Sequence, residues 1–340
     1  MIRLNFHSVY CQSLSYFRPM KSIFRLTRLP NLVIVALTQY ALQYAILLPE
    51  LGKIGQKPLL PDFQFFLLVA STVLIAAGGY VVNDIEDVEI DRLNKPEHKR
   101  IVERVYPLSI CWKIYWFITI LGFFISLYLA FFIHDFVQLT IYPAAVALLW
   151  AYSKWFKRQP LIGNLIVSGF CAFVAWVVLY AQCLVTPMPK TILNLGNSSE
   201  MSYQNYALNV LLIFWTYAIF AFISTLFREI IKDMEDVTGD KAQGCRTLPV
   251  LLGIKKTKII AFIIGCLFIN SLLTLSVFFF NYLFKNDYSK VIILNLTITL
   301  PVCYALFLLI KSKEKEDYAR LSKIAKLIML SGLIFILIMT

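Results

Sequence analysis

Two acidic strings hold the residues of this chain that are best suited to chemistry. The first runs from Asn83 to Asp91 (Asn-Asp-Ile-Glu-Asp-Val-Glu-Ile-Asp), and the second runs from Lys232 to Asp240 (Lys-Asp-Met-Glu-Asp-Val-Thr-Gly-Asp). The aspartates repeat with one spacing: Asp84, Asp87 and Asp91 correspond to Asp233, Asp236 and Asp240. Carboxylates gathered beside apolar sequence repel one another unless cations hold them. The simplest such cation is Mg²⁺, and a phosphate-bearing substrate is the simplest reason to hold it there.

The spacing places carboxylates on one side of a helix. If the helix continues past the membrane surface, Asn83, Asp87 and Asp91 form one stripe, because residues four apart are neighbours on a helix. Two facing stripes of this kind could hold one or more Mg²⁺ ions. A single acidic stretch would more often be a solvated loop, but two copies with one spacing favour a functional site. The predicted metal ligands are Asn83, Asp84, Asp87, Asp91, Asp233, Asp236 and Asp240.

Basic residues accompany the strings and predict an anionic substrate. Arginine binds phosphate in a bidentate manner, and lysine binds it as a point charge. Each cation taken alone is better explained as a topology signal or a lipid-headgroup contact, whereas the set favours a bound diphosphate. The cations that we consider for this role are Arg92, Lys95, Lys154, Lys157, Arg228 and Lys241.

The rest of the sequence is typical of a polytopic membrane protein. Of its 340 residues 59% are hydrophobic, and the mean hydropathy is +0.71, which is too apolar for a soluble domain. Seven cysteines without a CxxC pair and three histidines do not predict a metal site of their own. We predict an all-α bundle of nine transmembrane helices, near residues 30–49, 62–82, 107–133, 136–152, 161–185, 205–227, 257–281, 289–310 and 322–339.

The distribution of Lys and Arg predicts the orientation of this bundle. With the N-terminus inside, 26 Lys and Arg fall in the inner segments and five in the outer loops, a strong positive-inside signal. The net charge of +12 therefore marks cytoplasmic loops and not a nucleic-acid partner. Both strings then lie at the cytoplasmic face. Residues 1–28 are predicted to form a basic membrane-surface segment, followed by a single transmembrane domain over 29–340.

These features resemble the UbiA superfamily of intramembrane prenyltransferases. The resemblance rests on Asn83-Asp-x-x-Asp87-x-x-x-Asp91 after the second apolar run and the second Asp-rich motif after the sixth. It implies a ring of helices around a lipid-opening cavity, capped by the motif loops, with Mg²⁺ as cofactor and a prenyl diphosphate as substrate. The residues that it implies as catalytic are Asp87, Asp91, Asp236 and Asp240. Arg28, Asn31 and Tyr152, the last together with Lys154 or Lys157, resemble further substrate-binding elements of the family.

Local segments resemble one branch, the geranylgeranylglycerol-phosphate geranylgeranyltransferases. They are the segment 91–96, the segment Pro160–Asn164 with Asn164 as a further binding residue, and the segment 228–249. Glu97–Val102 departs from the run common in that branch, so the acceptor stays open. A glycerol-phosphate ether lipid is the first choice, and an aromatic acid or quinone precursor is the alternative.

The resemblance implies a reaction through an allylic carbocation, and two other classes of protein compete with it. Mg²⁺ and cations would stabilise the diphosphate leaving group, while apolar helices shield an allylic carbocation from water. The other classes are a cation-coupled carrier, which is disfavoured because the acids lie at one face, and a catalytically inactive lipid-binding protein. Membrane lipids are expected to surround the protein, and no obligatory protein partner is inferred.

Overall fold

Helices account for all the regular structure in the described residues except one isolated bridge between Val102 and Tyr106. The computed structural model describes residues 22–94, 100–183, 197–282 and 287–338. Its α-helices are α2 (Leu29–Ala41), α3 (Leu48–Lys53), α4 (Asp62–Glu86), α5 (Val88–Asn94), α6 (Leu108–Ile133), α7 (Phe136–Lys154), α8 (Ile162–Cys183), α9 (Asn197–Ala242), α10 (Leu248–Tyr282), α11 (Tyr288–Leu294), α12 (Leu300–Lys311) and α13 (Lys315–Ile338). The π-helical stretches η1 (Leu42–Leu47) and η5 (Asn295–Thr299) join α2 to α3 and α11 to α12, and η3 (Phe156–Arg158) is a short 3₁₀ turn. The all-α prediction is confirmed.

Eight helical stretches in the described residues are long and apolar enough to cross a membrane. They are Leu29–Lys53, Asp62–Glu86, Leu108–Ile133, Ile162–Gln182, Leu208–Ala242, Leu248–Val277, Tyr288–Lys311 and Lys315–Ile338. These stretches match eight of the nine predicted runs. The fourth predicted run, 136–152, forms α7, a helix of 19 residues with Pro143 inside it, which is not among the eight.

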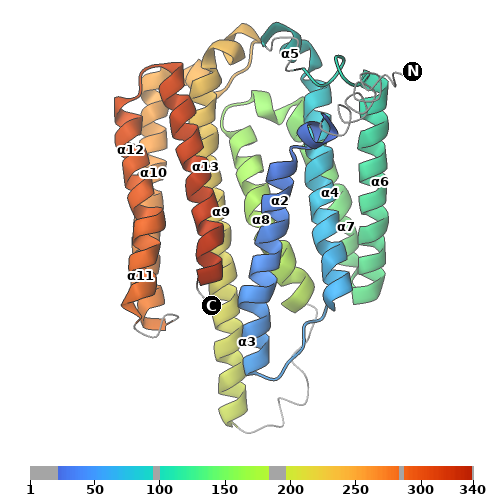
Figure 1. Ribbon diagram of the computed structural model, residues 1–340, viewed down its shortest axis with the longest axis vertical. Helices are drawn as coiled ribbons and strands as arrows, with labels where there is room; N and C mark the ends of the chain where they lie inside the picture. The colour runs from blue at the N-terminus through green and yellow to red at the C-terminus, as the bar shows by residue number, and fades with distance from the viewer. Residues whose placement is uncertain (1–21, 95–99, 184–196, 283–286, 339–340) are drawn as a thin grey trace, which may run out of the picture.

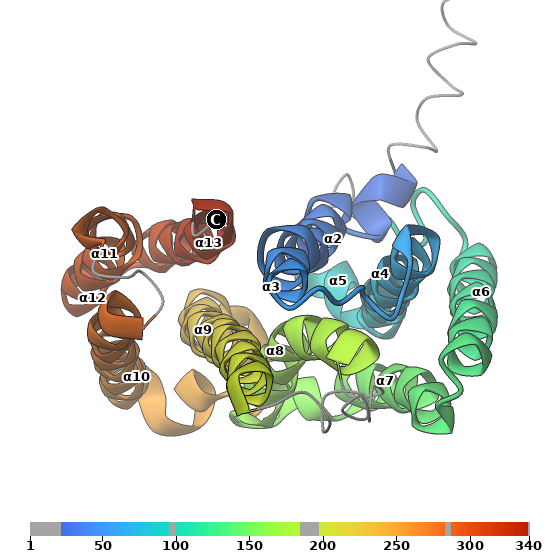
Figure 2. The same ribbon diagram turned by 90° about the horizontal axis from the view of Figure 1, so that it is seen from below.

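The long helix α9 lies at the middle of the bundle and divides it into two packed groups (Figure 2). On one side, α9 packs with α10, α12 and α13 around fully buried side chains such as Phe268 and Leu321. On the other side, side chains from α2, η1, α3, α4, α8 and α9 share a buried cluster that includes Leu42, Phe65 and Phe214. The outer surface is apolar, as a bilayer requires, and on α6 the side chain of Phe117 is 69% exposed.

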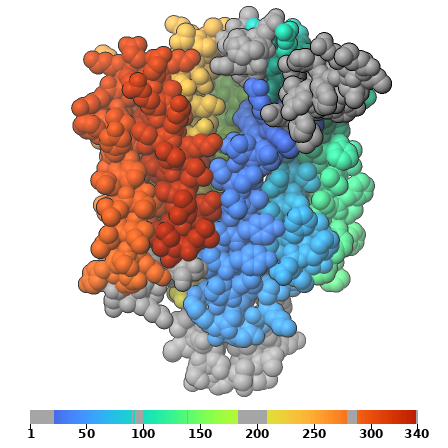
Figure 3. Space-filling model, viewed as in Figure 1, coloured from blue at the N-terminus to red at the C-terminus, as the bar shows by residue number. Residues whose placement is uncertain are grey.

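The first and last helices of the bundle meet along one side. Helix α2 contacts α13 as well as α4, and Figure 3 shows α13 and α2 next to each other on one face of the molecule. We call this contact the α2–α13 seam. The seam joins the two groups of helices on the side away from α8.

Both acidic strings are helical, which corrects the expectation that they form loops. Helix α9 continues without a break through the whole second string to Ala242. In the first string, α4 ends at Glu86 and α5 begins at Val88, but the helical hydrogen bonding persists across Asp87. The Asp87 amide donates to the Asn83 carbonyl at 3.0 Å, and the Asp91 amide donates to the Asp87 carbonyl at 2.7 Å.

The reason for this difference is that hydropathy marks the edge of the apolar layer and not the end of a helix. Lys and Glu have good helix propensity, so a helix can leave the membrane without breaking. The strings therefore extend helices α4 and α9 at the same end of the bundle, where Figure 1 also shows α5. We call this the motif end.

Candidate active site

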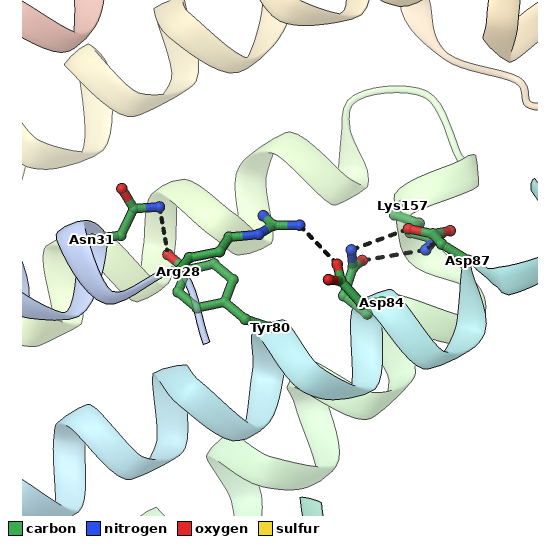
Figure 4. A network of polar contacts seen from close by, with 7 residues as sticks. Arg28, Asn31, Tyr80, Asp84, Asp87 and Lys157 are labelled. Carbon is green, nitrogen blue, oxygen red and sulfur yellow. Dashed lines mark hydrogen bonds and ion pairs between the residues drawn. The ribbon is translucent and has the colours of Figure 1, made fainter. Parts of the chain in front are cut away.

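Lys157 binds the first acidic string at the motif end. It lies in the turn η3 between α7 and α8, and its ammonium donates to Asn83 Oδ1 at 3.2 Å and to Asp87 Oδ1. Asn83 Nδ2 in turn donates to Asp87 Oδ2 at 3.1 Å, so that the three side chains form a closed group (Figure 4). Burial lowers the pKa of the Lys157 ammonium, while the Asp87 carboxylate opposes that shift. With only 13% of the Lys157 side chain and 20% of the Asp87 side chain exposed, this ion pair is largely screened from solvent.

Close packing of a glycine places Lys157 at this position. A Cβ atom added to Gly163, at the start of α8, would lie 2.9 Å from Lys157 Cα and 3.0 Å from the Phe156 carbonyl oxygen. Since both are backbone atoms, only glycine lets the turn η3 approach α8 this closely. Gly163 therefore determines where the Lys157 side chain starts.

A second polar group connects Arg28 to the same string. The Arg28 guanidinium lies over the Tyr80 ring, 4.8 Å from its centroid, and donates to Asp84 Oδ1 at 3.2 Å. Asn31 Nδ2 donates to the Tyr80 hydroxyl at 3.3 Å, and Asn31 Oδ1 accepts from Lys326 Nζ at 3.3 Å. Arg28 has a left-handed backbone (φ 52°, ψ 51°), a conformation that costs free energy for a non-glycine residue and is concentrated at functional sites.

The second string has uncharged hydrogen-bond partners. Asn164 Nδ2, at the start of α8, donates to Asp233 Oδ2 at 2.8 Å. The Thr247 hydroxyl, just before α10, donates to Asp240 Oδ2 at 3.0 Å. Asp236 is exposed at the end of α9. Among the described residues, Asp233 and Asp240 are thus held by neutral donors and not by an ion pair.

The two strings come together in one site. The Asp87 and Asp240 carboxylates are close enough to interact electrostatically. Cys245, in the turn after α9, feels the charges of both: burial and then the Asp240 carboxylate raise the pKa of its thiol, and Asp87 adds to that effect. The backbone amide of Arg246 donates to the Arg158 carbonyl at 2.8 Å, which ties this turn to the turn that carries Lys157.

Several predicted binding residues lie at this site. Arg28, Asn31, Lys157 and Asn164 contact the strings or the group around Tyr80, as described above. Half-buried Tyr152 lies between the strings, within range of the charges of Asp87, Asp233 and Arg28. Arg228 pairs with Glu229, and its Nε is buried without a hydrogen-bond partner among the described residues. This buried donor is available for an anion.

Other predicted binding residues are directed elsewhere. Exposed Lys154 lies over the rings of Trp150 and Trp155, at 4.7 and 5.6 Å from their centroids. The exposed Arg92 forms an ion pair with Glu103, whose pKa this pair holds below its usual range. Lys241 is exposed at the end of α9, and Lys95 lies outside the described residues. These local partners could not be predicted from the sequence.

The predicted ligands fit Mg²⁺ chemically but are not gathered into a finished metal site. All of them offer carboxylate or amide oxygen, which Mg²⁺ prefers, and the Asp87–Asp240 interaction shows carboxylates of both strings in range of each other. Within the described ranges, no group of three His, Cys, Asp or Glu side chains converges on one point. The contacts of Lys157 with Asp87 and of Arg28 with Asp84 explain this, because they engage carboxylate oxygens that a metal would use. Mg²⁺ commonly uses one or two carboxylates with substrate phosphates, so an incomplete cluster is compatible with it.

Three contact residues were missed in the sequence. Tyr80 lies one turn before Asn83 on α4, and this helical spacing could have identified it. Lys326 lies within the predicted span 322–339 and on α13, but it was not among the predicted binding residues. Thr247 follows the second string by seven residues and carries no recognisable signal.

Comparison with known proteins identifies the family of this chain and proteins of similar fold. The model of the UbiA prenyltransferase family matches residues 54–329. A digeranylgeranylglyceryl phosphate synthase of Sulfolobus acidocaldarius is 34% identical over 200 residues, which cover 59% of this chain and 62% of the relative, less than two thirds of it. The synthase of the same name from Korarchaeum cryptofilum is 30% identical over 278 residues, which cover 82% of this chain and 86% of the relative.

Solved structures show a similar arrangement of helices. A structure of a digeranylgeranylglyceryl phosphate synthase superposes with a TM-score of 0.58 at 23% identity, covering 94% of this chain and 99% of that one. A UbiA homologue from Archaeoglobus fulgidus bound to DMAPP and Mg²⁺ superposes with a TM-score of 0.51 at 14% identity, covering 93% and 99%. At these identities the likeness concerns the fold.

Proposed function

Because this chain belongs to the UbiA prenyltransferase family, we propose that it transfers a prenyl group from a prenyl diphosphate to geranylgeranylglyceryl phosphate in an Mg²⁺-dependent reaction. The observation that carries the proposal is the meeting of both acidic strings at the motif end, with Lys157 bound to Asn83 and Asp87. Relatives named as digeranylgeranylglyceryl phosphate synthases support the acceptor. The Archaeoglobus fulgidus homologue, bound to DMAPP and Mg²⁺, supports the donor and the cofactor.

The site residues divide into metal ligands and phosphate ligands. Asn83, Asp87 and Asp91 from the first string and Asp236 and Asp240 from the second would hold Mg²⁺, which supplies positive charge for the departing diphosphate. Asp84 and Asp233 would complete the carboxylate set at the edges of the site.

Cations of this chain would bind the diphosphate directly. Lys157 donates to Asn83 and Asp87, which are also the predicted metal ligands. When Mg²⁺ binds these two side chains, Lys157 would donate to a phosphate oxygen of the substrate instead of to Asp87. The buried Nε of Arg228 would donate to the same anion. Donors already fixed where charge develops stabilise a transition state without reorganisation.

Bond changes follow from the allylic donor. The C–O bond between the prenyl C1 and the diphosphate breaks, and its electron pair leaves with the diphosphate. A lone pair of the acceptor hydroxyl forms the new C–O bond to C1, and the hydroxyl proton passes to the diphosphate, a base that the same reaction releases. The residues of the bundle would contribute by keeping water from the cation.

The placement in the membrane belongs to the same proposal. We infer nine membrane spans with α7 as the fourth, a lipid-opening cavity, and a motif end that faces the cytoplasm, as the 26 to 5 distribution of Lys and Arg indicates. Residues 29–340 would form the single catalytic domain, preceded by the basic segment 1–28. Residues 1–21 of that segment lie outside the described residues.

Parallel assays with one donor and several acceptors test the function. Purified protein in detergent receives geranylgeranyl diphosphate with geranylgeranylglyceryl phosphate, 4-hydroxybenzoate or dihydroxynaphthoate, each with Mg²⁺ and with EDTA. We expect a Mg²⁺-dependent ether-lipid product and diphosphate release. Prenylated aromatic acid as the sole product would overturn the acceptor, and an absence of transfer to every acceptor would overturn the enzymatic assignment.

A further inference from the structure

Lys326 is a cation within α13 that points to the α2–α13 seam. It lies eleven residues after the first residue of α13, Lys315, which corresponds to roughly 16 Å along the helix axis. Its ammonium donates to Asn31 Oδ1 on α2 at 3.3 Å. The contact therefore joins the last helix of the bundle to the first.

The surroundings of Lys326 distinguish it from neighbouring cations on the same helix. Arg320 and Lys323 are exposed, whereas Lys326 is half-buried. Among the described residues, Lys326 has no carboxylate within ion-pair distance, and its hydrogen-bond partner is the neutral amide of Asn31. A charged group withdrawn from water is costly unless an opposite charge accompanies it.

A series of side-chain contacts links Lys326 to the first string. Asn31 bonds to the Tyr80 hydroxyl, and Tyr80 lies under Arg28, which binds Asp84. Lys326 is thus at the end of a chain of contacts that begins at the first string. Lys326 is the residue of α13 in this series of contacts, and it reaches Asn31 across the α2–α13 seam.

Both helices of the seam carry exposed apolar side chains. Leu327, the next residue on α13, is 63% exposed, and Val33 on α2 is 46% exposed. Figure 3 shows both helices at the surface of this face. An amphiphile that entered here would keep its tail in lipid while its headgroup met the ammonium of Lys326.

We propose that Lys326 binds the phosphate of the lipid acceptor as that lipid enters between α2 and α13. The inference rests on the proposed function and adds a residue that selects the acceptor. An ammonium has three hydrogens, so two remain for phosphate oxygens while the third stays on Asn31. The phosphate supplies the negative charge that Lys326 lacks in the described structure.

The proposal predicts selectivity for a phosphorylated acceptor without an effect on the donor. The experiment measures KM for geranylgeranylglyceryl phosphate, for its neutral analogue geranylgeranylglycerol and for the prenyl diphosphate. The variants are Lys326→Met, Lys326→Arg and, as the matched control one turn away, Lys323→Met. All are assayed as full-length protein in detergent, and the donor KM reports whether each variant is folded.

In Lys326→Met we expect KM for the phosphorylated acceptor to rise about tenfold or more, as for the loss of a hydrogen bond to a charged group. KM for the neutral analogue and for the donor should stay within about twofold of wild type. Lys326→Arg should retain most of the preference for phosphate, because it keeps the charge, and Lys323→Met should behave like wild type.

Other results would contradict either the role of Lys326 or the proposed function, and the two cases can be distinguished. An equal rise of the donor KM in Lys326→Met would overturn the proposal, since the residue would then serve the diphosphate or the fold. An unchanged acceptor KM in that variant, or a wild-type protein that uses the neutral analogue equally well, would also overturn it. Failure of the proposed function would be visible earlier, in a wild-type protein that prenylates only aromatic acids.

Discussion

Replacing Lys157 by methionine should change donor binding and metal binding in opposite directions. The substitution keeps most of the side-chain length and removes the charge that lies on Asn83 and Asp87. The donor should bind more weakly, because a phosphate contact is lost. A divalent cation should bind more tightly to the protein without substrate, because Lys157 no longer competes for the Asp87 carboxylate.

The structure sets the size of the effect. The Lys157 side chain is 13% exposed and that of Asp87 is 20% exposed, so solvent screens their contact only in part. A hydrogen bond to a charged group contributes about 1.5–3 kcal/mol, which corresponds to a change of roughly 10- to 150-fold in an equilibrium constant. We expect a rise of this order in the donor KM, with a smaller gain in metal affinity because Asn83 still bonds to Asp87.

Two measurements on the same preparations check this prediction. The donor KM is determined at saturating Mg²⁺, and Mn²⁺ binding to substrate-free protein is followed by electron paramagnetic resonance. Lys154→Met is the matched control, because Lys154 lies three residues earlier but stacks on Trp150 and Trp155. If Lys157→Met weakened metal binding in proportion to donor binding, the reasoning would be refuted, and Lys157 would be a packing residue of the turn.

Further predictions concern the metal, the turn and the topology. Asp87→Ala should lower kcat by about 10²–10³-fold, as for the loss of one electrostatic element of a transition state, and turnover near wild type at saturating Mg²⁺ would exclude Asp87 as a ligand. Gly163→Ala should raise the donor KM as Lys157→Met does, since the added Cβ would meet the Lys157 backbone at 2.9 Å; an unchanged donor KM together with unchanged melting would contradict this. Single cysteines at positions 57 and 246, in a background free of other cysteines, should react with a membrane-impermeant maleimide from opposite sides, and labelling from one side only would refute the proposed topology.

Most of the fold could be predicted because the bilayer imposes a simple rule on sequence. Any segment that crosses it must satisfy its backbone hydrogen bonds internally, so apolar runs of sufficient length become helices. The ends of helices could not be predicted in this way. Helix α9 continues to Ala242 and α13 begins at Lys315, because charged residues such as Lys and Glu can continue a helix outside the apolar layer.

The part of the candidate site that rests on a repeated sequence motif could be predicted. The contacts between residues that are far apart in the sequence could not. The spacing of the acidic strings identified Asp87 and Asp240, which the structure brings into electrostatic contact. Lys154 and Lys157 were equivalent in sequence, since each follows Tyr152 in the same predicted inner loop. The packing of η3 on Gly163 and the two indoles next to Lys154 determine that Lys157, and not Lys154, contacts the first string.

The contacts from Asp84 through Arg28, Tyr80 and Asn31 to Lys326 imply a thermodynamic linkage between the two substrates. Donor and acceptor would bind at opposite ends of this chain of side chains. Occupancy of one end would therefore alter the free energy of occupying the other, and such coupling must be reciprocal. The order in which donor and acceptor bind is then a property of these few polar contacts, and a change at Asn31 would alter that order without touching either reacting group.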